Sequence, residues 1–175
     1  MLSFSSLNSN ERTLLMLMAY FYKYGQTKKK LSNLLEKIML PSLSDLAFKR
    51  LMTDGLLVEV NLHYYGGGKV LYINKDMLIP SLFELFKEEN SLLLQNIRSL
   101  YKKTYNNDNP SPLVRLIIYY IAPNAKEAIS TSYAQVLETF NDCCLNLIDE
   151  REYETFFLSM STELLSFVLN ATLRM

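Results

Sequence analysis

The residue types that most often carry chemistry are sparse in this chain of 175 residues. His63 is the single histidine, and the two cysteines, Cys143 and Cys144, are adjacent. A four-ligand zinc site and a disulfide framework both need more of these residues at separated positions. The sequence therefore predicts no metal site and no disulfide framework, and the cysteine usage indicates a reducing, cytoplasmic compartment.

Motifs of enzyme active sites are also missing from the sequence. Gly66–Lys69 reads GGGK but lacks both the four-residue spacer and the Ser/Thr of a phosphate-binding P-loop. No G-x-S-x-G nucleophile elbow occurs. The acidic cluster Asp149–Glu154, which surrounds Arg151, is more typical of an exposed helix start than of a metal site. We therefore expect a protein that is not an enzyme and that has no cofactor.

The remaining candidate chemistry is that of positive charge. Lys28, Lys29 and Lys30 are consecutive and open a predicted helix, where lysines are unfavourable without an anionic partner. Helix-terminal N–H groups and lysines together suit phosphate. A solvated lysine run is the alternative. The charge is also uneven along the chain: Met1–Pro80 carries a net charge of +4 and Ser81–Met175 a net charge of −4, which predicts different partners for the two parts.

The composition predicts a globular protein outside the membrane. Hydrophobic residues make up 49% of the chain and charged residues 21%, which suffices for a packed core. The apolar runs Leu14–Tyr22 and Leu113–Ala122 are too short to span a bilayer, and Phe156–Leu173 contains Glu163 and several Ser/Thr. The N-terminus lacks the basic region of a secretory signal.

Apolar spacing indicates that three helices precede a β-hairpin. The helices are expected from a cap at Ser9 or Asn10 to Gly25, from a cap at Thr27 to Pro41, and from a cap at Ser42 or Ser44 to Asp54. Gly55 is placed to end the third helix in a left-handed conformation. Leu56–Tyr65 and Lys69–Asn74 then read as two strands joined by the glycine triplet Gly66–Gly68.

Two stretches carry a resemblance to a known superfamily. LSNLLEKIMLPSLSDLAFKRLMTDGLL, residues 31–57, resembles the helix–turn–recognition-helix core of winged-helix transcription regulators, and GGGKVLYIN, residues 66–74, is similar to their second wing strand. The resemblance covers about Asn10–Pro80. It implies a nucleic-acid-binding domain with the third helix in the major groove, the start of the second helix near phosphate, and the wing beside the backbone.

The resemblance also implies a set of DNA-binding residues. The candidate phosphate contacts are Lys28, Lys29, Lys30, Lys49, Arg50 and Lys69; the residues nearest the bases are Ser42, Ser44 and Asp45; and Tyr64 and Tyr65 lie at the wing. Asp45 and Lys49 share a helix face, so a surface salt bridge is the alternative for that pair. Leu46 occupies a groove-facing place on the predicted third helix, and tyrosines also occur where proteins meet proteins.

Beyond Pro80 the pattern is wholly helical. One long helix is expected from Pro80 or Ser81 to about Thr104, then a loop at Tyr105–Pro112. Further helices are expected at Leu113–Ala122, at Pro123–Ile148 and from about Glu152 onward, which together make a bundle of about four helices. The apolar last helix predicts burial against this chain or another, and its run to Met175 suggests an N-terminal piece of a longer protein.

The predicted fold is mainly α (α+β): residues 1–80 as a winged helix-turn-helix with a two-stranded wing, and residues 81–175 as a helical bundle for dimerisation or docking. The predicted function is that of a cytoplasmic DNA-binding protein, a transcription regulator or DNA-transaction module, whose partners are double-stranded DNA and a second copy or another protein. The alternative is a winged-helix protein-interaction module or the N-terminal domain of a larger complex.

Overall fold

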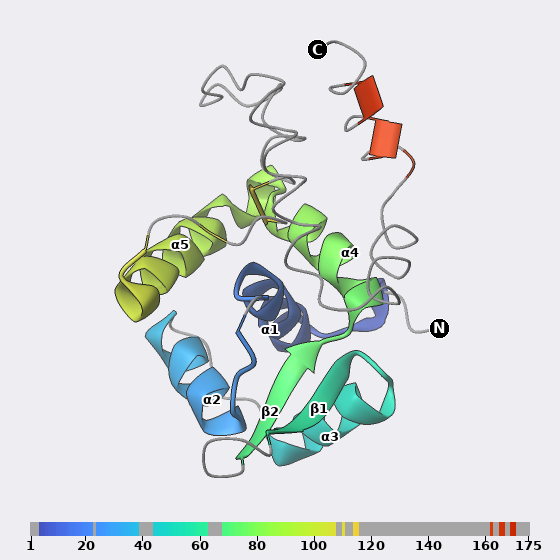
Figure 1. Cartoon of the computed structure of the whole chain (residues 1–175), viewed down its shortest axis with the longest axis vertical. Helices are drawn as coiled ribbons and strands as arrows, with labels where there is room; N and C mark the ends of the chain where they lie inside the picture. The colour runs from blue at the N-terminus through green and yellow to red at the C-terminus, as the bar shows by residue number, and fades with distance from the viewer. Residues whose placement is uncertain are drawn as a thin grey trace. The chain divides into compact units, whose positions relative to one another are not determined.

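The computed structural model describes residues 4–22, 24–38, 44–62 and 68–107, with isolated positions at 110, 114, 115, 162, 165, 166, 169 and 170. It divides into two compact units, Met1–Asp108 and Asn109–Met175. The first unit is mainly helical with a small two-stranded antiparallel sheet (Figure 1). The helices predicted from Leu113 to the C-terminus, and the bundle they would form, lie outside the described residues.

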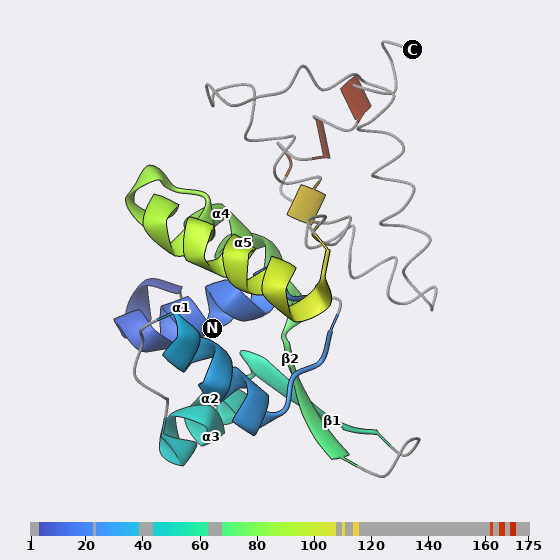
Figure 2. The same ribbon diagram turned by 90° about the vertical axis from the view of Figure 1, so that its left-hand side faces the viewer.

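The elements of the first unit follow one another in this order: η1 (Phe4–Ser6), α1 (Ser9–Tyr20), α2 (Lys28–Lys37), α3 (Asp45–Thr53), β1 (Leu57–Leu62), β2 (Gly68–Ile73), α4 (Lys75–Leu85), η2 (Glu88–Asn90) and α5 (Ser91–Tyr105). The α4 and α5 helices lie on one side of α1, and α2 and α3 lie on the other (Figures 1 and 2).

The central helix is α1, which packs against α4 and β2. Every residue from Thr13 to Tyr20 is buried, so no side of this part of the helix faces solvent. A helix that is apolar on all sides forms the middle of a core rather than its edge. Of the apolar residues that the helical spacing places here, Leu14, Leu15, Leu17, Met18 and Phe21 are buried, whereas Tyr22 is half-buried.

Two details at the ends of α1 differ from the sequence prediction. Asn8, not Ser9 or Asn10, caps the helix, because only Asn8 stands three residues before Glu11 and completes a reciprocal capping box with it. The helix ends at Tyr20, before Gly25. Gly25 has a different role: a Cβ atom there would lie 2.5 Å from the Tyr72 ring, so the absence of a side chain lets this ring pack against the backbone.

The helices α2 and α3 begin as their caps predict. The Thr27 side chain accepts from the Lys30 N–H at 3.2 Å, and the Ser44 side chain accepts from the Ala47 N–H at 3.2 Å. Of the two caps left open for α3, Ser44 is therefore the one used. Gly55 has φ +72°, which confirms that it ends α3 in the left-handed region. Pro41 and Ser42 lie outside the described residues.

The sheet consists of β1 and β2 in antiparallel register, with Leu57 opposite Ile73 and Val60 opposite Val70. Gln26, in the segment between α1 and α2, forms an isolated bridge with Leu71 through two backbone hydrogen bonds of 3.0 and 2.8 Å. The hairpin is thus extended by one residue of a third segment, which ties it to the start of α2.

The predicted single helix from Pro80 to Thr104 is wrong: two helices, α4 and α5, occupy this region with η2 between them. Asn74 caps α4 by accepting from the Asp76 N–H, and Pro80 lies inside the helix on its exposed side. An internal proline cannot donate a backbone hydrogen bond to the carbonyl four residues before it, and its ring crowds that carbonyl, so Pro80 weakens the hydrogen bonding of α4 at this point.

At the other end of α4, Asn90 Nδ2 donates to the Glu84 carbonyl at 2.8 Å, which stabilises the break before α5. The predicted domain boundary between residues 80 and 81 falls inside α4. The compact first unit extends to Asp108 and includes α5.

Candidate nucleic-acid interface

The three lysines that open α2 have different surroundings. The Lys28 ammonium lies 6.0 Å from the centre of the Phe48 ring, and the Lys30 ammonium lies 5.2 Å from the centre of the Tyr105 ring. Lys29 is exposed. A contact with an aromatic face attracts a cation without cancelling its charge. The start of α2 therefore keeps three positive charges, two of which are held by rings of other elements.

The exposed positions of α3 are polar except for Leu46. Asp45 and Lys49 are exposed, and Leu46 between them is 77% exposed. Phe48 and Leu51 occupy the opposite, buried face. The ion pairs found among the described residues do not include one between Asp45 and Lys49, so both charged side chains face solvent.

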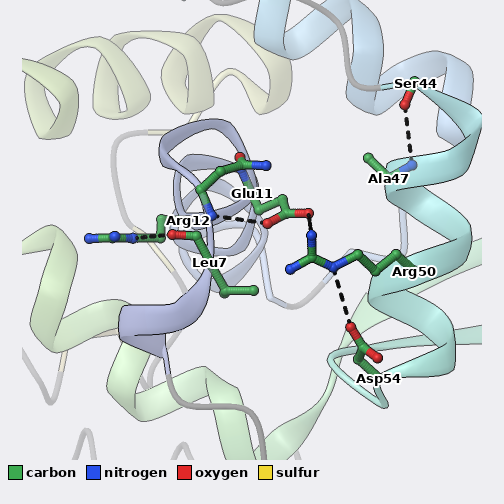
Figure 3. A network of polar contacts seen from close by, with 8 residues as sticks. Leu7, Glu11, Arg12, Ser44, Ala47, Arg50 and Asp54 are labelled. Carbon is green, nitrogen blue, oxygen red and sulfur yellow. Dashed lines mark hydrogen bonds and ion pairs between the residues drawn. The ribbon is translucent and has the colours of Figure 1, made fainter.

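Arg50 is the one candidate phosphate contact held between two carboxylates. Its guanidinium lies 3.5 Å from a Glu11 oxygen and 3.6 Å from an Asp54 oxygen (Figure 3). The Glu11 side chain is only 1% exposed, whereas that of Arg50 is 48% exposed. A buried carboxylate requires a cation nearby, and Arg50 supplies it. Arg50 thus joins α3 to the first turn of α1.

Glu11 is a site-supporting residue that the sequence reasoning did not connect to α3. One of its oxygens accepts from the Asn8 N–H at 3.0 Å, while the other faces Arg50. Next to it, Arg12 Nε donates to the Leu7 carbonyl at 2.9 Å (Figure 3). The N-x-x-E spacing predicts the capping box, but no residue near Glu11 in the sequence predicts its ion pair with Arg50 on α3.

At the hairpin, Lys69 Nζ lies 2.7 Å from Glu59 Oε1. The Lys69 side chain is 67% exposed, so water screens this pair and weakens it. Val58 and Val60, which point to the other face of β1, are 44% and 39% exposed. His63, Tyr64 and Tyr65 lie outside the described residues, as does the glycine tip at residues 66 and 67.

An aromatic cluster, which the sequence analysis did not anticipate, joins the end of α1 to α5. It consists of Tyr20, Phe21, Tyr24, Tyr101 and Tyr105. Burial, together with hydrogen bonding to Tyr24, raises the pKa of Tyr101 to about 12. Burial also raises the pKa of Tyr20 and of Tyr105. Tyr20, Tyr101 and Tyr105 therefore stay neutral to a higher pH than an exposed tyrosine.

Two further classes of site can be addressed within the described ranges. No group of His, Cys, Asp and Glu side chains there could hold a metal ion. No helix in that part of the chain is long and apolar enough to cross a membrane. Cys143, Cys144 and the acidic cluster Asp149–Glu154 lie outside the described residues.

The start of α2 meets α3 through Lys28 and the Phe48 ring, and α3 packs against β1 of the hairpin that follows it. Lys28, Lys29, Lys30, Lys49 and Lys69 contribute ammonium groups, whereas Arg50 is held by carboxylates and Ser44 by its capping bond. No known protein family, curated protein or solved structure matches this chain.

Proposed function

We propose that the first unit is a winged helix-turn-helix module that binds double-stranded DNA. The observation that carries this proposal is the outward face of α3, where Asp45, Leu46 and Lys49 are exposed, in a helix that follows the lysine-led α2 and precedes the hairpin along the chain. A recognition helix in this position can enter the major groove while the preceding helix and the wing contact the backbone.

The phosphate contacts in this proposal are Lys28, Lys29, Lys30, Lys49 and Lys69. The ring-bound lysines keep their charge, and the Lys69–Glu59 pair is exposed enough to exchange its carboxylate for a phosphate. Arg50 contributes indirectly, because its ion pairs orient α3 against α1. Tyr64 and Tyr65 at the wing remain candidate contacts to the sugar-phosphate backbone.

Base reading falls to a small set of groups in this proposal. Asp45 can accept from a cytosine amino group, and the Leu46 side chain suits the methyl group of thymine. Ser44 is occupied as the α3 cap, and Ser42 keeps its proposed place near the bases. With so few groups facing a groove, we expect binding to depend mainly on phosphate, and selectivity among sequences to be modest.

The test is fluorescence anisotropy of a labelled random duplex at several salt concentrations. Five neutralised phosphates correspond to a slope of about −4.5 in a plot of log affinity against log salt. Lys29→Ala should make this slope shallower by about 0.9. Lys37→Ala is the matched control, since Lys37 is also exposed but lies in the last turn of α2. Absence of binding at low salt would reject the proposal.

A protein-interaction module is the second candidate, and one observation favours it: Leu46, in the first turn of α3, is 77% exposed. A large apolar side chain at that place suits a protein surface, and the neighbouring Arg50 is already paired. Leu46→Gln discriminates between the two functions. It should change duplex affinity little if α3 binds DNA, but it should abolish binding of a protein partner if α3 is a docking helix.

We also propose that residues 109–175 serve dimerisation or docking in a cytoplasmic protein. Support comes from the apolar C-terminal segment and the acidic balance of the sequence after Pro80. Sedimentation equilibrium of the whole chain tests self-association. A monomer at micromolar concentration would reject the homodimer.

A further inference from the structure

The last turn of α5 touches the segment that joins α1 to α2 (Figure 2). Tyr105, the final residue of α5, stacks on Tyr24 with ring centres 4.0 Å apart and planes inclined by 17°. Its hydroxyl oxygen accepts a hydrogen bond from Gln26 Nε2 at 2.9 Å. One side chain of α5 therefore makes both an apolar and a polar contact with this segment.

Gln26 links Tyr105 to the hairpin. Gln26 is 1% exposed, and its backbone N–H and carbonyl are both bonded to Leu71 of β2. Its side-chain amide also donates to the Tyr24 carbonyl at 2.8 Å. The side-chain amide thus donates one hydrogen bond to Tyr105 and one to Tyr24, and these two bonds fix the conformation of the Gln26 side chain. The Gln26 backbone is bonded to β2.

The same tyrosine also contacts the start of α2. The Lys30 ammonium lies 5.2 Å from the Tyr105 ring centre, and the Lys30 N–H is bonded to the Thr27 cap. Gln26 directly precedes Thr27 in the chain. The Tyr105 ring thus contacts Lys30 of α2, and the Tyr105 hydroxyl is linked through Gln26 to β2 of the hairpin.

We infer that Tyr105 and Gln26 are positioning residues, through which the last turn of α5 sets the places of Lys30 and of β2. The expected effect on DNA binding rests on the proposed function, whereas the positioning of Lys30 and β2 by Tyr105 does not depend on it. By this inference, α5 contributes to the geometry of the candidate interface. Gln26 Oε1 is buried without a hydrogen-bond partner among the described residues, so the Gln26 side chain is held through its two Nε2 bonds.

Three variants of the whole chain separate the contacts. Tyr105→Phe keeps the ring over Tyr24 and under Lys30 but removes the hydroxyl from Gln26. Tyr105→Leu removes the ring as well. Tyr20→Phe is the matched control, because it removes a tyrosine hydroxyl from the same cluster, beside Arg98 rather than Gln26.

Amide hydrogen exchange, followed by NMR, is the first readout. In Tyr105→Phe, exchange of the Gln26 and Leu71 amides should be about fivefold faster, as expected for loss of one neutral hydrogen bond, and faster still in Tyr105→Leu. Amides in the middle of α1 should keep their wild-type rates in Tyr105→Phe and Tyr20→Phe. Unchanged exchange at Gln26 and Leu71 in Tyr105→Phe would overturn the inference, and this variant retains almost all of the packing.

Duplex affinity is the second readout. Tyr105→Leu should bind several-fold more weakly than wild type, whereas Tyr20→Phe should bind equally well. Wild-type affinity in Tyr105→Leu would overturn the role in positioning Lys30 and the hairpin. If the wild-type chain binds no duplex at all, the proposed function fails, and the exchange rates alone still decide whether Tyr105 positions β2.

Discussion

Arg50 on α3 and Lys30 on α2 are both cations of the candidate interface, but their side chains have different partners. Arg50 lies between the carboxylates of Glu11 and Asp54. Lys30 lies over the neutral ring of Tyr105. Carboxylates cancel the charge of an arginine, whereas an aromatic ring holds a lysine and leaves its charge available to phosphate. The value of a basic residue for DNA binding therefore depends on its partner as well as its exposure.

The largest effect on stability should come from breaking the Arg50 network. Arg50→Ala leaves the buried Glu11 carboxylate without its cation, and we expect a loss of about 2–3 kcal/mol in the free energy of unfolding. Urea denaturation measures it. Lys49→Ala, at the neighbouring exposed position, should stay within about 0.5 kcal/mol of wild type. Equal losses in the two variants would show that the carboxylate pairing does not stabilise the fold.

Alkaline pH should weaken the tyrosine cluster beneath Lys30. Burial raises the pKa of Tyr101 to about 12 from the ordinary value of 10.0, so the unfolded chain ionises first. The corresponding stability is complete below about pH 10 and is lost as the pH rises toward 12. Urea midpoints between pH 9 and 12 test this. Tyr101→Phe, which cannot ionise, should show a smaller decline, and an identical decline would contradict the assignment to Tyr101.

Glu11→Gln should leave Arg50 with less of its charge cancelled, as the charge of Lys30 is left by the Tyr105 ring. Glu11→Gln keeps an acceptor for the Asn8 N–H, as capping boxes with Gln do, but removes one of the two charges that face Arg50. If the first unit binds duplex, the salt dependence should steepen by up to about 0.9 in slope. Glu36→Gln, at an exposed position on α2, is the control. A slope unchanged from wild type would mean that Asp54 alone keeps Arg50 from phosphate.

A smaller loss of stability than that of Arg50→Ala is expected for Lys30→Ala. Losing the contact with the Tyr105 ring should cost about 0.5–1 kcal/mol. In the binding assay, however, the slope should become shallower by about 0.9, whereas Arg50→Ala should leave it close to that of wild type. The reverse ranking of the two slopes would refute the distinction between a ring-held and a carboxylate-held cation.

Much of the first unit could be predicted because its signals are local. Thr27 and Ser44 cap their helices, Gly55 ends α3 with a positive φ, and two antiparallel strands form on either side of residues 63–67. Each of these depends on residues within a few positions of one another. The error at Pro80 also comes from a local signal: prolines are common in the first turn of a helix, but the Asn74 cap starts α4 before Pro80.

The contacts that differentiate the cations could not be predicted from the sequence. Glu11 meets Arg50 across two helices, and Gln26 meets Tyr105 across 79 positions of the chain. No periodicity or spacing encodes such a pair. Gly25 likewise looked like a helix stop, and only the packed ring of Tyr72 explains why a side chain is excluded there.

The amino-acid sequence by itself determined α2 and α3 with their caps, the apolar course of α1, the hairpin and the run of basic residues at the start of α2. These follow from backbone preferences and apolar periodicity, which act over a few residues. Only the tertiary structure decided which cations meet carboxylates and which meet rings, and that α5 closes on the segment before α2. The physical reason is that burial and charge pairing depend on which distant elements pack together.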